Sequence, residues 1–311
     1  ALTGSHTELL MAGGNMGVYS TIAGDSDGIM AEGSSDVTVT GLNDLEIRAM
    51  AGDASGITAI GYSSADVSMT GEITVGTISG DAIGIGAEDN SYAIVRMDAD
   101  KTDNDIKVWT NAGNAYGAVA SGDSDIVFEN VRDLVVTTAL GDAYGLFAND
   151  PSTISGDVES ITVTASGNAF GAYAYSESSI DALMSGDISV ESTAAGVAIG
   201  IGADTSSDVT ITGLNDLTVL ANAGDATGID AYYSSTIDVS MSGDITVSTA
   251  EGDAYGAIAD YGSNVYLTGA KAMDVSATSG DAYGLYSTRG SLISGDVQTI
   301  EVISVSDDAY G

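Results

Sequence analysis

A five-residue motif, Gly-(Asp/Asn)-Ala-x-Gly, recurs with small departures through nearly the whole chain of 311 residues, and this repeat limits the possible folds most. Most successive copies lie 28 residues apart. The copies begin at Gly24, Gly52, Gly80, Gly113, Gly141, Gly167, Gly196, Gly224, Gly252 and Gly280. Short units of equal length bury their apolar faces by stacking on their neighbours. We therefore expect residues 1–311 to form one continuous domain.

Each unit contains three short segments in which apolar side chains alternate with variable ones. In the first segment, two constant apolar columns flank a variable position, as in Ile57-Thr58-Ala59. The other two segments alternate in the same way, as in Val67/Met69 and Ile73/Val75. Period-two alternation is typical of half-buried strands. The sequence therefore predicts an all-β, single-domain parallel β-solenoid with three short strands per coil of about 28 residues. Ten to eleven coils, each adding about 4.8 Å, give a rod of about 50 Å.

Composition excludes several classes of partner and cofactor. Asp and Glu number 45 against 7 Lys and Arg, for a net charge of −38. Nucleic acid and anionic membranes attract clustered basic residues, so neither is an expected partner. No run of 18 apolar residues occurs, so no membrane insertion is expected. The chain has no Cys and one His, His6, so thiolate and His-rich metal sites are excluded and no organic cofactor is expected.

The coils carrying Gly-Asp-Ala-Tyr-Gly and Ile-Ser-Gly-Asp-Val resemble the β-helical repeats of bacterial extracellular adhesins and autotransporter passenger proteins. The second motif occurs at 154–158 and again at 293–297. The resemblance covers almost the entire chain. It implies a secreted or surface-displayed stalk, adhesin or fibre, and it brings no catalytic residues. An extracellular or cell-surface location is therefore expected.

Acidic residues gather in two arrangements that suit divalent cations. The aspartates of the glycine motif would stack along the rod, where they either accept backbone N–H groups within their turns or bridge coils through cations. An insertion at 98–105 carries Asp98, Asp100, Asp103 and Asp105. Four carboxylates so close together are suitable Ca²⁺ ligands, and a solvated acidic loop is the alternative.

Aromatic residues fall into two sets. Those at the fourth motif position, such as Tyr116 and Tyr144, are expected to point inward and stack at a corner of the core. A second set lies at variable or turn positions and is expected to be exposed, either scattered or as a face that stacks on glycans. Its candidate ligand-binding members are Tyr173, Tyr175, Tyr232, Tyr233, Tyr261 and Tyr286. Enzyme activity is not expected, because basic residues are few and the turns are too short to wall a cleft.

The two ends of the sequence look like parts of one coil. Ala1, Leu2, Thr3 and Gly4 match a second segment, whereas Asp308, Ala309, Tyr310 and Gly311 begin a new unit. Both ends are therefore expected to be mid-coil and uncapped. Either identical subunits complete the coil head to tail, or both ends are cut from a longer polypeptide. The first functional hypothesis is thus a subunit or segment of a surface filament, and the alternative is a monomeric adhesin that binds glycans.

Overall fold

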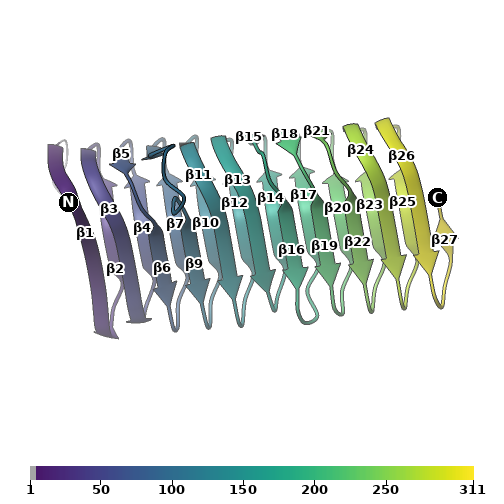
Figure 1. Cartoon of the computed structure of the whole chain (residues 1–311), viewed down its shortest axis with the longest axis horizontal. Coiled ribbons are helices and arrows are strands. Elements are labelled where there is room, and N and C mark those ends of the chain that lie inside the picture. The colour runs from purple at the N-terminus through teal and green to yellow at the C-terminus, as the bar shows by residue number, and fades with distance from the viewer. Residues whose placement is uncertain (1–4) are drawn as a thin grey trace.

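The computed structural model describes residues 5–311 as an elongated rod of stacked coils (Figure 1). Within this range it contains 27 strands and no helix. Every pairing between strands is parallel, and each coil adds one strand to a sheet of eleven, sheet B. The predicted all-β parallel solenoid is therefore confirmed. No helix long and apolar enough to span a membrane occurs in the described residues.

Sheet B contains the first segment of every unit. Its strands are β2 (Ser26–Glu32), β4 (Ala54–Ile60), β7 (Ala82–Glu88), β10 (Ala115–Ser121), β12 (Ala143–Asn149), β14 (Ala169–Tyr175), β17 (Ala198–Asp204), β20 (Ala226–Ala231), β23 (Ala254–Ala259), β25 (Ala282–Ser287) and β27 (Ala309–Tyr310). The strands pair in register, so that Ile29, Ile57 and Ile85 lie over one another. The predicted apolar columns of this segment are therefore continuous through the rod.

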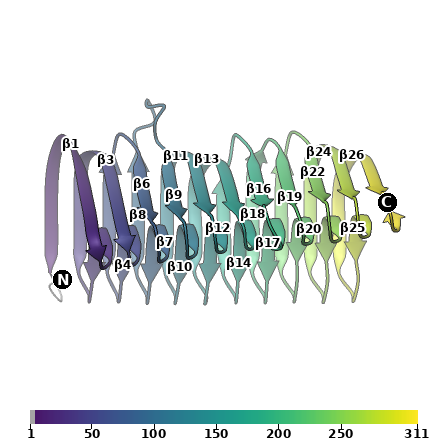
Figure 2. The same ribbon diagram turned by 90° about the horizontal axis from the view of Figure 1, so that it is seen from below.

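Sheet A, with 16 strands, contains the second and third segments together. In six coils these segments form one long strand: β1 (His6–Ala23), β3 (Asp36–Ala51), β11 (Asp125–Thr138), β13 (Thr153–Ala165), β24 (Asn264–Ala277) and β26 (Leu292–Ser304). In the other coils they are separate: β5 (Ser64–Met69), β6 (Ile73–Thr77), β8 (Tyr92–Met97), β9 (Ile106–Thr110), β15 (Ser179–Leu183), β16 (Ile188–Ser192), β18 (Asp208–Leu214), β19 (Leu217–Ala221), β21 (Thr236–Met241) and β22 (Ile245–Thr249). Figure 2 shows the connection between β8 and β9, the predicted insertion, projecting from the rod.

The core is one continuous apolar column between the two sheets. Ile57, Val67 and Val75, from the three segments of one coil, are fully buried. The largest fully buried side chains include Phe128 and Leu42, both from sheet A. Since each coil alone would expose these side chains on both sides, stacking supplies most of their burial. Each unit therefore depends on its neighbours for stability.

A bend in the strands of sheet B creates a crease on its outer face. In β12, the residues from Ala143 to Ala148 point in, out, in, in, out and in, so Gly145 and Leu146 both face the core. A Cβ at Gly145 would lie 2.4 Å from the carbonyl oxygen of Gly171 and 2.7 Å from Ile161, which leaves room only for glycine. Two successive inward residues bend the strand, as in a β-bulge. The outward side chains on either side of the bend then converge: the rings of Tyr144 and Phe147 are 4.8 Å apart.

The same bend corrects the prediction for the aromatics of the fourth motif position. Counting by twos from Leu146 places Tyr144 inside, but the extra inward residue, Gly145, reverses the parity. Tyr116 and Tyr144 are therefore half-buried on the outer face, where they stack with ring centres 5.1 Å apart. The expected stacking is present, and the expected inward orientation is wrong.

A serine in each of ten successive coils follows the corner that joins sheet B to sheet A, and all of them except Ser291 are buried. The series comprises Ser35, Ser63, Ser91, Ser124, Ser152, Ser178, Ser207, Ser235, Ser263 and Ser291. The backbone N–H of each of the first nine donates to the Oγ of the next over 3.0–3.2 Å. This serine ladder satisfies N–H groups that would otherwise be buried without an acceptor.

Candidate functional site

The crease on the outer face of sheet B carries two aromatic stacks. The first runs over β10, β12 and β14 through Tyr116, Tyr144, Phe147, Phe170 and Tyr173, with neighbouring ring centres 4.7–6.3 Å apart. The second covers β23, β25 and β27 through Tyr255, Tyr283, Tyr286 and Tyr310. Aromatic pairs at these separations stabilise one another beyond their buried area. The two stacks therefore border the strands that lie between them on either side.

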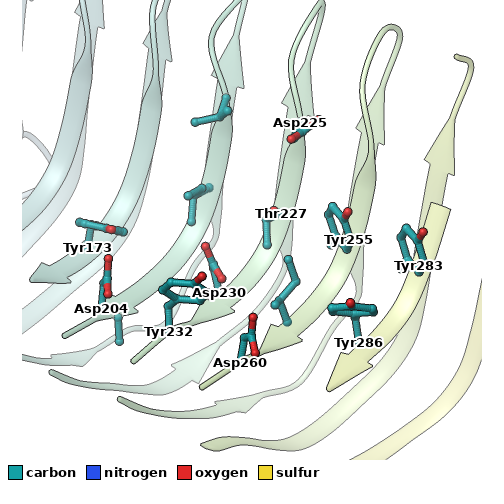
Figure 3. Close-up of a pocket in the computed structure, with 14 residues that line it drawn as sticks. Tyr173, Asp204, Asp225, Thr227, Asp230, Tyr232, Tyr255, Asp260, Tyr283 and Tyr286 are labelled. Carbon is teal, nitrogen blue, oxygen red and sulfur yellow. The ribbon is translucent and has the colours of Figure 1, made fainter. Parts of the chain in front are cut away.

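Between the stacks, β17 and β20 place smaller side chains in the crease, and a cavity of about 430 Å³ results (Figure 3). Ile199 and Gly202 lie on β17, and Thr227 and Asp230 take the equivalent positions on β20. Tyr173 closes one side, while Tyr255 and other tyrosines of the second stack close the other. The cavity exists because neither β17 nor β20 carries an aromatic residue in the crease.

Gly202 sets the position of the Tyr173 wall. A Cβ at Gly202 would lie 2.4 Å from Cδ2 of Tyr173 and 2.7 Å from its Cε2. The tyrosine ring therefore leans over the glycine of the next coil and borders the cavity. Burial raises the pKa of Tyr173, so its hydroxyl stays protonated at ordinary pH.

Three carboxylates from successive coils surround the middle of the cavity. Asp204 and Asp260 belong to one outward column, in which Tyr232 lies between them, and Asp230 lies two residues before Tyr232. Figure 3 shows Asp230 beside Tyr232, with the other two carboxylates in the neighbouring coils. Among the described residues, Asp230 has no hydrogen-bond or ion-pair partner. Desolvation, followed by the charges of Asp204 and Asp260, raises its pKa to about 7.

Asp260, in contrast, is held by other groups. Its carboxylate accepts a 2.8 Å bond from the guanidinium of Arg289 and a 2.7 Å bond from the backbone N–H of Tyr261. The guanidinium also lies 4.1 Å from the ring centre of Tyr261. Asp260 therefore has a cationic partner, whereas Asp204 and Asp230 form no ion pair among the described residues.

The structure brings together only some of the tyrosines proposed as a ligand face. Tyr173, Tyr232 and Tyr286 line the cavity. Tyr233 and Tyr261 lie beside it and pack on Tyr232, with ring centres 4.4 and 5.1 Å from it. The sixth member, Tyr175, is exposed one coil before Asp204 and does not line the cavity.

Sequence reasoning missed Asp230, Gly202, Tyr255 and Tyr283 as members of a site. One signal was present in the sequence: Asp230 and Gly202 occupy a column whose other members include Phe147, Tyr173 and Tyr286. In that column the aspartate lies one coil after the glycine. That signal required knowing that the column lies in a crease. Period-two alternation predicts a flat face, so it could not show convergence.

The acidic insertion does not gather its four carboxylates. The Asp98 carboxylate accepts the N–H of Asp100 over 3.2 Å, as in a turn, and Asp105 forms ion pairs with Lys107 and Arg132, each at 3.2 Å. Among the described residues, no group of three or more acidic or His side chains is arranged to hold a metal ion. Calcium binding by Asp98, Asp100, Asp103 and Asp105 stays a prediction.

The aspartates and asparagines of the glycine motif accept hydrogen bonds along the rod. In this series the side-chain oxygen accepts the N–H of the equivalent residue in the following coil, over 2.7–3.1 Å. The sequence suggested N–H groups of the same turn, and the structure places the donors one coil further on. Asn114 and Asn168 accept equally well, so the bond needs no negative charge. This role accounts for the column without a cation.

The cavity brings polar and aromatic groups together at one place on the rod. It offers carboxylate acceptors, the faces of several tyrosines and the hydroxyl of Thr227. In comparisons with known proteins, the chain matches no protein-family model, no curated protein and no solved structure.

Proposed function

We propose that this protein is a structural rod that assembles head to tail into a filament at the cell surface. The observation that supports this most is the exposure of core positions in the terminal coils. Ile300 belongs to the same column as Met273 and Ile245, which are fully buried, yet Ile300 is 39% exposed. At the other end Leu9 pairs with the buried Val39 and is 45% exposed.

The two terminal edges suit one another. β1 and β26 are the terminal strands of sheet A, and each leaves one edge without a partner strand. Because all strands run in the same direction, β26 of one copy could pair in parallel with β1 of another. Adding a second copy of the chain would pair these edges and cover the apolar columns, as a further coil does inside the rod. Ala309 and Tyr310 already pair with β25, so they would continue sheet B, and Asp308 and Gly311 flank them. The predicted contributors Ala1 to Gly4 lie outside the described residues.

Light scattering and electron microscopy of the purified chain test this proposal. We expect rods that lengthen with protein concentration in units of about 50 Å. Ile300→Asp should stop the lengthening, because it places a charge in the covered column. Ser294→Asp, on the outward face of the same strand, is the matched control and should assemble normally. Short monomeric rods at all concentrations would refute the assembly.

The second candidate is an adhesin that binds glycans through its tyrosines. The cavity between the aromatic stacks supports this candidate, since Tyr173, Tyr232 and Tyr286 line it and aromatic faces pack well on sugar rings. A glycan array probed with monomeric protein tests this candidate. Saturable binding that Tyr232→Ala abolishes would support it, and an array without binding would exclude it.

A further inference from the structure

The cavity on β17 and β20 combines two features that recognise organic cations. Tyr173, Tyr255 and Tyr286 surround it, and aromatic faces attract cations through their quadrupole. Asp204 and Asp230 contribute carboxylates on adjacent coils. Of these, Asp204 accepts only a 3.0 Å bond from the hydroxyl of Thr205, and Asp230 accepts none among the described residues. Both carboxylates therefore retain free lone pairs for a ligand.

The surroundings supply no counter-charge to Asp230. The residues that line the cavity, all within the described range, include no Lys, Arg or His. The nearest guanidinium described above, that of Arg289, is already bound to Asp260. The chain as a whole carries a charge of −38, which raises the local concentration of cations. A ligand with a positive charge would thus meet a complementary field at this point of the rod.

We propose that this cavity binds an organic ammonium ion, with the charged nitrogen at Asp230 and the carbon groups against the faces of Tyr173, Tyr255 and Tyr286. The site is independent of the head-to-tail assembly, because it lies in the crease of sheet B and involves neither terminal edge of sheet A. Its acceptors suit the N–H donors of a primary ammonium, and its volume suits a small molecule or the end of a longer one.

Other ligand classes fit less well. A bare divalent cation needs several converging oxygens, and no such group of acidic residues exists in the described chain. A neutral sugar needs hydrogen-bond donors as well as acceptors. The hydroxyls of Tyr255 and Tyr283 already donate to Asp253 and Asp281, over 3.2 and 2.8 Å. The lining also holds four carboxylates, those of Asp204, Asp225, Asp230 and Asp260, beside the hydroxyls of Tyr173, Thr227, Tyr232 and Tyr286. Carboxylates only accept when they are ionised, and a neutral sugar would supply no counter-charge to them.

The charge of Asp230 makes binding depend on pH. The groups that face it are Asp204 from β17, Asp260 with its partner Arg289 from the β23 side, Tyr232 directly after its own strand, and Tyr173 from β14, whose hydroxyl stays protonated. Because Asp230 has a raised pKa, it is protonated in the free protein at pH 5 and ionised at pH 8. The ammonium ion should therefore bind more tightly at pH 8 than at pH 5, and binding near pH 7 should release a proton.

Matched pairs of probes separate charge from shape. We would titrate the protein at pH 8 and low salt with butylammonium and glucosamine, and with their neutral counterparts butanol and glucose, by calorimetry and saturation-transfer NMR. We expect both amines to bind and both neutral probes to bind at least tenfold more weakly. Equal binding of glucose and glucosamine would overturn the proposal in favour of a glycan site. Binding of Ca²⁺ alone, without the amines, would also overturn it.

Two variants locate the site. Asp230→Asn keeps the size of the side chain and should weaken amine binding at least tenfold and remove most of its pH dependence. Asp238→Asn is its control, because Asp238 is exposed on sheet A in the same coil. Tyr255→Leu should weaken binding severalfold, whereas Tyr266→Leu on β24 should not. Circular dichroism verifies that each variant folds. Unchanged affinity in a folded Asp230→Asn variant would overturn the proposal.

Discussion

Removing one hydroxyl from the serine ladder should measurably destabilise the rod. Ser235 is fully buried, and its Oγ accepts the N–H of Ser207 over 3.1 Å. Ser235→Ala leaves this N–H without an acceptor in a place that water does not reach. An unsatisfied buried donor costs about 1–3 kcal/mol. At about 2 kcal/mol, the equilibrium for opening this coil shifts by roughly thirtyfold.

The preceding residue provides the control. Ser234 is exposed, and its backbone N–H donates to the carbonyl of Tyr261 over 3.0 Å, a bond that does not involve its side chain. Ser234→Ala should therefore change the free energy of unfolding by less than about 0.5 kcal/mol, as usual for a surface position.

Two measurements distinguish a local effect from a global one. Urea unfolding followed by circular dichroism gives the overall change, and native-state hydrogen exchange reports the protection of the Ser207 amide itself. Solenoids often open in parts, so the exchange data are needed. We expect the loss of protection to centre on Ser207 and its neighbouring coils. Equal stability of the Ser235→Ala and Ser234→Ala variants, with an unchanged Ser207 amide, would refute the reasoning.

Three further predictions address the strands, the turns and the cavity. Gly84→Ala places a Cβ 2.5 Å from the carbonyl oxygen of the following coil and should cost about 3 kcal/mol or more in urea unfolding. Gly86→Ala meets only side-chain atoms, the nearest being methyl groups at 3.1 and 3.4 Å, and should cost less than about 1 kcal/mol. Asp53→Asn should be nearly neutral in thermal melts because the amide oxygen still accepts the next N–H, while Asp53→Ala should lose about 1 kcal/mol. Asp230 has a folded pKa of about 7 against 3.8 when unfolded, so the folded protein holds a proton that the unfolded chain releases, and stability falls as pH rises through this window. Asp230→Asn should therefore stabilise the protein at pH 8 by up to about 4 kcal/mol and leave it unchanged below pH 4, and equal effects at both pH values would contradict the assignment.

The repeat in the sequence was sufficient to predict the coil. Spacing between the glycine motifs fixes which residues stack, and the structure pairs Ile201 with Ile229 as the alignment requires. Alternation also identified the apolar columns that face the core in all three segments, as at Val209 and Ile245. Repetition made these predictions reliable because each column is observed about ten times in one chain.

The crease and the cavity could not be predicted in the same way. Their geometry depends on one extra inward residue, such as Gly200 before Ile201, and period-two counting has no place for it. The serine ladder was visible as a serine at the same place in every unit, but the donors lie one coil away, so only the stacked structure identifies its bonds. Sites formed between coils need three-dimensional register before their chemistry can be recognised.

In-register stacking has a consequence for how such a rod can change over time. The ladders and the core use inward or turn positions alone, so the outward positions of sheet B outside the two aromatic stacks contribute little to holding the coils together. At Gly202 and Asp230 two such positions interrupt a row of aromatic rings and open a hollow without disturbing the strands beneath. Substitutions at a few outward positions could therefore create, widen or remove a binding site during evolution. Duplication of a whole unit could shift such a site by one coil.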